Sequence, residues 1–206
     1  MPRPDTAPTL ETERLVLRAH RMSDFAESAA MWAAPLVVRY ISGTLSTPEA
    51  SWSRLLRYAG HWRLLGFGYW AVETRASEFV GEVGLADYRR GALFPPRDGV
   101  PEAGWVLKAA QHGKGFAFEA ARCALAWADA NLEAPATVCL LDPGHAASIH
   151  VARKLGYGAD EPASYQEKPA LVLSRGRQGE CHSQPRPFPG ADRARAGQGR
   201  PAGGSE

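Results

Sequence analysis

Three features are scarce in this sequence, and each scarcity excludes a class of protein. No stretch approaches the roughly 20 consecutive apolar residues of a membrane-spanning helix, so we expect no membrane partner. Cysteine occurs only three times and without the spacing of a zinc site, which argues against a disulfide scaffold and a metal and indicates reduced thiols. The net charge is only +2, so no overall basic field exists to attract nucleic acid.

The composition that remains suits one folded domain with polar ends. Of the 206 residues, 45% are hydrophobic, which is enough for one substantial core. Residues 1–9 are polar and contain proline, which is not typical of a signal peptide, so we expect a disordered N-terminus and a cytoplasmic protein. Residues 175–206 are rich in Gly, Pro, Arg and Ala, which predicts a disordered tail. The predicted folded domain is therefore 10–174.

Hydrophobic periodicity predicts an α/β fold. The expected strands are 12–19, 68–73, 79–85, 102–107, 137–141 and 170–173. The expected helices are 24–34, 48–65, 115–131 and 147–155. Helices alternate with strands only in the second half, which predicts a mixed sheet that is antiparallel first and partly parallel later.

One loop has the composition of a phosphate-binding turn. Residues 111–117 follow an expected strand and open an expected helix. Gly113 and Gly115 allow the main chain to turn tightly and expose its N–H groups, and the helix start adds a partial positive charge. Lys114 adds a full charge. An ordinary strand-to-helix turn uses the same residues, and neither the Rossmann nor the Walker pattern fits.

Three segments together carry a more specific pattern, GWVL at 104–107, QHGKGFAFEA at 111–120 and DPGHAASIHVARKLGY at 142–157. In this order they resemble the GNAT superfamily of N-acetyltransferases. The opening segment LETERLVLR at 10–18 is similar to the first strand of the RimJ/RimL type, the ribosomal-protein N-terminal acetyltransferases. The resemblance implies the GNAT fold, with a mixed central sheet of six to seven strands flanked by about four helices.

The resemblance also implies a site for acetyl-coenzyme A as cosubstrate. In the family, the strand before the glycine loop carries a bulge and separates from the next strand, and pantetheine lies between them. Carried over to this chain, the main chain of Val106, Leu107 and Lys108 would contact pantetheine. The pyrophosphate would be wrapped by His112, Gly113, Lys114, Gly115, Phe116 and Ala117. Family members often have Arg or Gln at the position of His112.

The segment 142–157 would supply the thiol side of the site. Relatives place Asn, which contacts coenzyme A, where this chain has His145, and a histidine can still donate a hydrogen bond. Ser148 matches the serine that the RimJ/RimL type places near the thiol, where a hydroxyl can protonate the departing thiolate. Capping the following helix is its alternative role. Many other GNAT enzymes use Tyr as the acid at the position of Ala152.

Acetyl transfer needs a group that removes a proton from the attacking amine. Three carboxylates are candidates for this base, namely Glu82, Glu102 and Glu167. Each is also compatible with a surface role, and water can relay the proton instead. A main-chain N–H near Leu107 is the candidate donor to the thioester carbonyl.

Three functions are therefore open. The first is an active acetyltransferase, monomer or homodimer, whose acceptor is a small amine or a protein N-terminus. Trp32, Trp52 and Trp62 lie on the two early helices, where they line the acceptor side or pack in the core. The second is an inactive GNAT fold that binds coenzyme A or a partner. The third is a nucleic-acid-binding module that uses the arginines of the tail.

Overall fold

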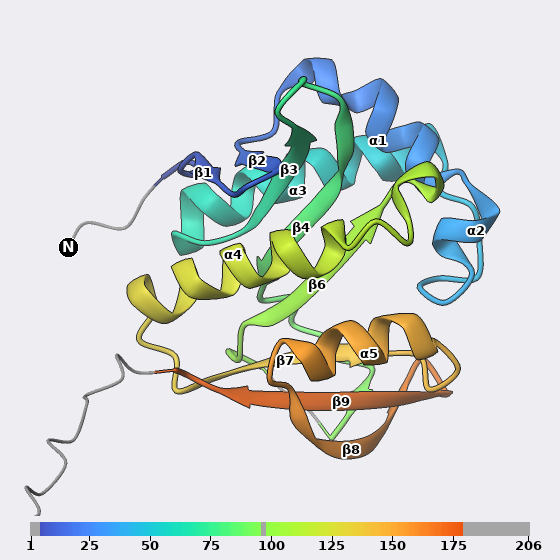
Figure 1. Ribbon diagram of the computed structural model, residues 1–206. Helices are drawn as coiled ribbons and strands as arrows, with labels where there is room; N and C mark the ends of the chain where they lie inside the picture. Colours follow the sequence, from blue (N-terminus) through green and yellow to red (C-terminus); the bar gives the residue numbers. More distant parts are fainter. Residues whose placement is uncertain (1–4, 96–97, 179–206) are drawn as a thin grey trace, which may run out of the picture.

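The computed structural model describes residues 5–95 and 98–178 (Figure 1). Within these residues a nine-stranded mixed sheet runs through the molecule in the order β1-β2-β3-β4-β6-β7-β9-β8-β5. The strands are β1 (Leu10–Glu11), β2 (Leu15–Arg18), β3 (Tyr69–Thr74), β4 (Phe79–Ala86), β5 (Leu93–Phe94), β6 (Glu102–Leu107), β7 (Ala136–Leu141), β8 (Gly158–Tyr165) and β9 (Lys168–Gly176). Strands β6 and β7 are parallel, and the other neighbours are antiparallel.

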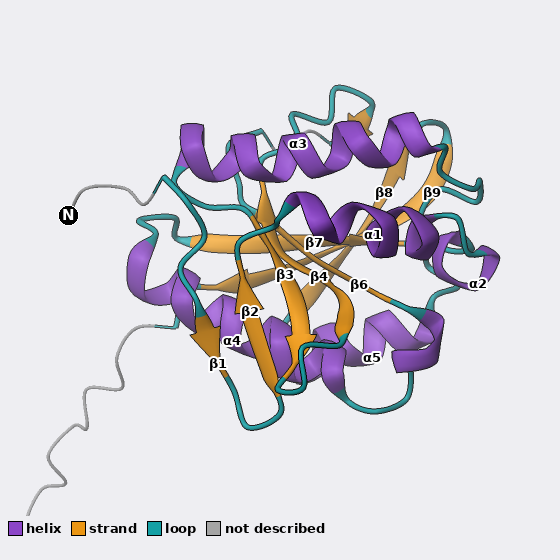
Figure 2. Ribbon diagram, turned by 90° about the horizontal axis from the view of Figure 1, so that it is seen from above, coloured by secondary structure: helices purple, strands orange, loops and turns teal. Residues whose placement is uncertain are grey.

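Helices cover both faces of this sheet. The helices are α1 (Phe25–Trp32), α2 (Pro35–Val38), α3 (Pro48–Leu65), α4 (Phe116–Asn131) and α5 (Ala146–Lys154). Figure 2 shows α1 and α3 on one side of the sheet and α4 and α5 on the other. None of the helices in the described ranges is long and apolar enough to cross a bilayer. The mixed α/β architecture predicted from the sequence is confirmed.

Helix α3 shows how local signals fix an element. The Thr47 hydroxyl accepts a hydrogen bond from the Ala50 N–H at 3.1 Å, and Pro48 occupies the first helical position. Gly66 ends the helix with φ 75°, a left-handed conformation that glycine adopts without strain. The start and the end predicted for this helix are both confirmed.

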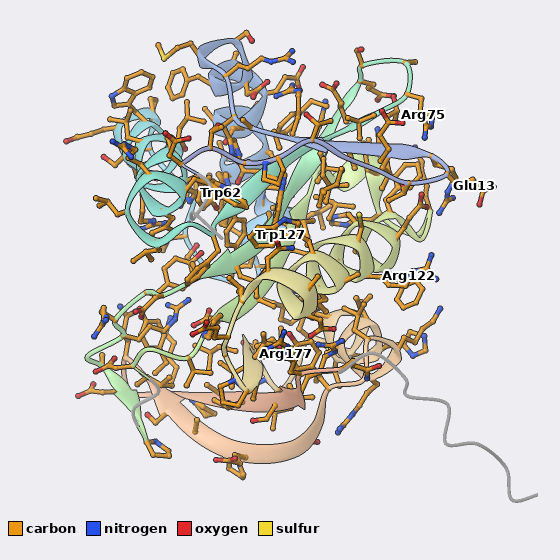
Figure 3. All side chains as sticks on the ribbon, turned by 90° about the vertical axis from the view of Figure 1, so that its left-hand side faces the viewer. Glu13, Trp62, Arg75, Arg122, Trp127 and Arg177 are labelled. Atoms are coloured by element: carbon orange, nitrogen blue, oxygen red, sulfur yellow. The ribbon has the colours of Figure 1, made fainter. Side chains whose placement is uncertain are left out.

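An aromatic cluster joins the two helical layers. Trp62 of α3 lies with its ring centroid 4.7 Å from that of Trp70 and 5.2 Å from that of Trp127 of α4. Figure 3 shows Trp62 and Trp127 close together in the interior. The Trp62 indole also donates a hydrogen bond to the Tyr69 carbonyl at 2.9 Å. Trp62 is therefore a core residue, which decides one of the alternatives left open by its position on an early helix.

The structure adds elements that periodicity did not predict. These are β1, β5 and β8 and helix α2. Seven of the described strands have four residues or more, and four of the described helices have eight or more. The six strands predicted by residue range correspond to six of these seven strands, β8 being the exception, and the four predicted helices correspond to the four longer helices.

The folded part also extends past the predicted boundaries at 10 and 174. The Pro8 carbonyl accepts a hydrogen bond from the Trp70 indole at 2.8 Å, and Ala7 is buried. At the other end β9 continues to Gly176, and buried Arg175 forms a bidentate ion pair with Asp129 at 2.9 and 2.6 Å. Residues 1–4 and 179–206, the remainder of the two predicted disordered ends, lie outside the described residues.

Candidate functional site

The site is built around the place where β6 and β7 separate. Strand β6 pairs with β4 in regular register over six residue pairs, from Ala86↔Glu102 to Gly81↔Leu107. With β7, although both strands are fully described, it shares a single register pair, Glu102↔Val138. The two strands therefore diverge toward their carboxyl ends, as the family resemblance implied. The bulge expected in β6 is absent, because its register with β4 shows no shift.

The main-chain groups of Leu107 face the gap between β6 and β7. The Lys108 N–H donates to the Val80 carbonyl at 2.9 Å, so the main chain of Lys108 faces β4. Because these groups alternate sides along a strand, those of Val106 also face β4, and those of Trp105 and Leu107 face β7. Of the three residues expected to offer main-chain contacts to pantetheine, Leu107 alone has the required direction. The register with β4 explains why Val106 and Lys108 do not.

The glycine loop opens helix α4 without a side-chain cap. Gly113 and Gly115 have φ of 76° and 80°, conformations that favour glycine. The first helical bond runs from the Glu119 N–H to the Gly115 carbonyl at 3.1 Å. The N–H groups of Phe116, Ala117 and Phe118 therefore have no partner within the helix and suit an anion.

Arg14 holds this loop in place from the far end of the sequence. Its guanidinium donates to the Lys114 carbonyl at 3.0 Å and to the Glu119 carboxylate at 2.7 Å, and it lies 4.8 Å above the Phe116 ring. Burial acts to raise the pKa of Glu119, but hydrogen bonds from Thr12 and Arg14 outweigh this effect and lower it. Glu119 therefore remains an anion that keeps Arg14 on the loop.

Polar contacts also hold the side chains of the loop. The Lys114 ammonium donates to Gln111 at 2.8 Å, and Gln111 donates to Glu78 at 2.7 Å. The His112 ring donates through Nε2 to the Leu107 carbonyl at 2.9 Å. The acceptor group of Leu107 is thus engaged by the loop, which leaves the Leu107 N–H as the group directed into the gap.

Ser148 faces β6 from the other side of the gap. It is the third residue of α5, whose N-cap is His145, so capping the start of this helix is not its role. Ser148 is buried, and its hydroxyl accepts a hydrogen bond from the Trp105 indole at 3.3 Å. Ala152 is fully buried in the core. Ser148 is therefore the hydroxyl that α5 directs toward the separated strand.

His145 is held by a residue that sequence reasoning missed. The Tyr40 ring, which follows α2, stacks on the His145 ring with centroids 4.6 Å apart. Burial lowers the pKa of His145, although Asp142 opposes this change, so the ring is neutral at pH 7. No local pattern pointed to Tyr40, because the two residues are far apart in sequence.

The three candidate bases have very different surroundings. Glu82 is fully buried on β4 opposite Val106, and it accepts hydrogen bonds from the Ser28 hydroxyl at 2.6 Å and the Trp32 indole at 2.9 Å. Glu102 forms a bidentate pair with Arg90, with both distances 2.7 Å. Glu167 is exposed in the turn between β8 and β9. Glu82 is thus the one candidate that is buried beside the strand of the site.

Trp32 and Trp52, the other two tryptophans of the early helices, have different surroundings. Trp32 lies under helix α3, with the Arg54 guanidinium 3.7 Å above its ring, and donates to Glu82. Trp52 is half-buried and makes an edge contact with Phe25, with centroids 5.4 Å apart. Trp32 therefore lines the polar surroundings of Glu82, which Trp52 and Trp62 do not.

Comparison with known proteins decides the family of this fold. Residues 14–158 match the model for the acetyltransferase (GNAT) domain. The chain belongs to the GNAT acetyltransferase family. Members of this family use acetyl-coenzyme A, and the described residues of this GNAT chain contain no group of three or more His, Cys, Asp or Glu that could hold a metal ion.

Individual relatives agree with this assignment. Uncharacterized protein YkkB of Bacillus subtilis (strain 168) is 31% identical over 111 residues, which span 53% of this chain and 62% of that protein, less than two thirds of its length. The crystal structure of an acetyltransferase from Agrobacterium tumefaciens str. C58 is 27% identical, with a TM-score of 0.69 over 82% of this chain and 94% of that chain.

The ribosomal L7/L12 alpha-N-protein acetyltransferase RimL, solved in complex with coenzyme A, also has this architecture. Its TM-score is 0.66 over 82% of this chain and 98% of that chain. The sequence identity is 12%, so this likeness concerns the fold alone.

Proposed function

We propose that this protein transfers the acetyl group of acetyl-coenzyme A to an amine and that the cosubstrate lies along the gap between β6 and β7. The observation that carries the proposal is the continuity of this gap with the glycine loop. The Leu107 N–H faces the gap, and the uncapped start of α4 follows nine residues later. Exposed N–H groups at a helix start suit a pyrophosphate.

Each residue around the gap has a separate role in this proposal. The N–H groups of residues 116–118 and the Lys114 charge bind the pyrophosphate, and Gly113 and Gly115 let the loop fold close to it. Acetyl-coenzyme A supplies a thioester whose carbonyl the amine attacks. The Leu107 N–H stabilises the negative charge that develops on the carbonyl oxygen. The Ser148 hydroxyl protonates or hydrogen-bonds the departing sulfur.

Glu82 is the carboxylate that we favour as the base. A carboxylate has about four acceptor positions, and Ser28 and Trp32 occupy two of them. The capacity that remains can accept a proton from an amine held on the α1 face of the sheet. Glu102 is engaged by Arg90, and Glu167 is exposed, so both are less suited to this role.

Two classes of acceptor are compatible with this reaction. The RimJ/RimL-like opening segment at 10–18 favours a protein N-terminus, and a small amine is the other class. We infer a cytoplasmic location from the reduced thiols, of which Cys123 and Cys139 lie in described residues and are free. Burial raises the pKa of Cys139 to about 12, so this thiol is unreactive.

Calorimetry together with thiol-release kinetics tests the proposal. Acetyl-coenzyme A is expected to bind and to add about 2.7 kcal/mol of stability at a hundredfold excess over its dissociation constant. Incubation with amines is expected to release coenzyme A thiol. No binding at millimolar ligand would refute the proposal. Binding without turnover would favour an inactive GNAT fold that binds coenzyme A. His145, which stands where relatives place Asn and stacks on Tyr40, is the feature that favours this alternative.

A further inference from the structure

The buried face of α3 carries polar groups without partners. Among the described residues, the buried side-chain atoms that lack a hydrogen bond are His20 Nε2, Ser51 Oγ, Arg54 Nη1 and His61 Nδ1. Ser51, Arg54 and His61 all belong to α3, at positions that fall on one side of a helix. Buried polar atoms in folded proteins nearly always have a partner, so this set indicates a ligand or ordered water.

Near this face, the His20 ring and the Glu82 carboxylate are both hydrogen-bond acceptors, and neither donates to the other. The His20 side chain is 4% exposed, and its Nε2 lies 3.8 Å from the fully buried Glu82 carboxylate, too far for a hydrogen bond. Burial lowers the pKa of His20, although Glu82 opposes this effect, and the ring bonds to the main chain of Tyr69. A neutral ring bound in this way directs a lone pair at a carboxylate. An amine, which carries N–H donors, would satisfy both groups.

The third group needs an anion. Arg54 donates through Nη2 to Ser46 at 3.1 Å, and its Nη1 has no partner. No Asp or Glu of the described residues lies within ion-pair distance of it, and burial lowers its pKa. The Arg54 guanidinium is half-buried, and its buried Nη1 has neither a hydrogen-bond partner nor a counter-ion, so this position favours an acidic ligand group.

One indole links the two halves of the cluster. The Trp32 ring lies under the Arg54 guanidinium at 3.7 Å, and its N–H donates to Glu82 at 2.9 Å. The cation and the carboxylate therefore sit at the face and the edge of the same side chain. A ligand that spans both would be small.

We propose that His20, Ser51, Arg54 and Glu82 bind the acceptor and that this acceptor is a compact amine carrying an acidic group, such as an amino acid. The amine bridges His20 Nε2 and the Glu82 carboxylate from one side, because the 3.8 Å that separates them leaves no room for an atom in line, and the acidic group binds Arg54 and Ser51. The inference rests on the proposed acetyl transfer and narrows its acceptor class. A protein N-terminus does not fit this arrangement. The carbonyl of its first residue belongs to an uncharged peptide bond, and the rest of the chain would have to leave the site at that point.

The wild-type protein provides the first test. Thiol release from acetyl-coenzyme A is measured with the common L-amino acids, β-alanine and 2-aminoethylphosphonate, and with the amide of each carboxylic acid that reacts. Mass spectrometry identifies the N-acetyl product. We expect kcat/KM to be at least about tenfold higher for an acid than for its amide, the change expected when a charged hydrogen bond is lost. Equal or faster reaction of amides or peptides overturns the inference.

Variants of Arg54 give the second test. Arg54→Leu is expected to remove most of the preference for acids while the affinity for acetyl-coenzyme A stays unchanged in calorimetry. Arg63→Leu is the matched control, since Arg63 is an exposed arginine of the same helix. Arg54→Lys keeps the charge and is expected to retain part of the preference, which covers the case in which the leucine variant does not fold.

The outcomes separate this inference from the proposed function. Suppose that the protein binds acetyl-coenzyme A and acetylates neutral amines, and that Arg54→Leu does not change its preference between acids and amides. This result overturns the acceptor assignment and leaves acetyl transfer standing. Failure of the wild-type protein to bind acetyl-coenzyme A overturns the proposed function and the acceptor assignment with it.

Discussion

Replacing Ser148 by alanine separates a chemical role from a structural one. The substitution removes a single hydroxyl, whose contact with the Trp105 indole is long at 3.3 Å. Trp105 is half-buried, so losing this acceptor costs at most about 1 kcal/mol. For a chain of this length that corresponds to a fall in Tm of about 2–4 °C. Ser148 is not the N-cap of α5, so no further loss of stability is expected.

The effect of Ser148→Ala on the rate is expected to be larger. A hydroxyl that stabilises the departing thiolate acts mainly in the transition state, so its loss lowers kcat and leaves ground-state binding intact. General acid catalysis is worth about 10²–10⁴-fold, and water can replace part of it, so we expect a fall of roughly tenfold or more. Thiol-release kinetics measure kcat, and calorimetry measures the affinity for acetyl-coenzyme A.

Trp105→Phe is the matched control for Ser148→Ala. It removes the indole N–H that faces Ser148 and keeps both an aromatic ring and the serine hydroxyl. We expect Trp105→Phe to lower Tm and to leave turnover close to that of the wild type. Normal turnover in Ser148→Ala together with a lower Tm would refute the role of acid. An equal loss of rate in both variants would show that the contact itself matters.

Three further substitutions test other parts of the structure. Gly115→Asp and Gly115→Asn both place a side chain on a left-handed residue, so they share the same backbone strain. Calorimetry should find weaker coenzyme A binding for Gly115→Asp, because its charge repels the pyrophosphate. Equal affinities of the two variants would contradict pyrophosphate binding at this loop. Glu82→Gln should lower kcat by about tenfold or more, whereas Glu102→Gln should not, and the reverse order would rule out Glu82 as the base. Arg175→Met leaves the nearly buried Asp129 unpaired and should cost about 3 kcal/mol in chemical unfolding; an unchanged free energy of unfolding would show that this ion pair contributes no net stability.

The elements that could be predicted from the sequence are those fixed by local signals. Helix α3 is bounded by Thr47 and Gly66, and the hairpin of β3 and β4 shows clear runs of apolar residues. Strand β8 was missed because its sequence GADEPASY is polar and contains proline. Its strand conformation follows from pairing with β9, which no local pattern expresses.

In the candidate site, too, the features that could be predicted are those that lie within one segment of the sequence. The glycine loop and Ser148 lie in contiguous segments, so their positions could be predicted. The ion pair of Arg14 with Glu119 and the stack of Tyr40 on His145 each join residues more than 100 positions apart, and no residue alone indicates its partner. The direction of the Leu107 main chain was also out of reach, because it depends on the register with β4.

The side chains of β6 alternate between the two faces of the sheet, and this alternation determines where the two substrates of the proposed reaction lie. The Trp105 and Leu107 side chains pack on the α4 and α5 face of the sheet, whereas Val106 packs with Trp32 on the α1 face. Groups proposed for coenzyme A and groups proposed for the acceptor therefore lie on opposite faces, one residue apart. A closed sheet would keep them separate. Because β6 and β7 diverge, the thioester and the amine can meet at the edge of β6, where the Leu107 N–H points. This is why a main-chain group of β6, which lies at the meeting point of both faces, is the donor assigned to the carbonyl oxygen.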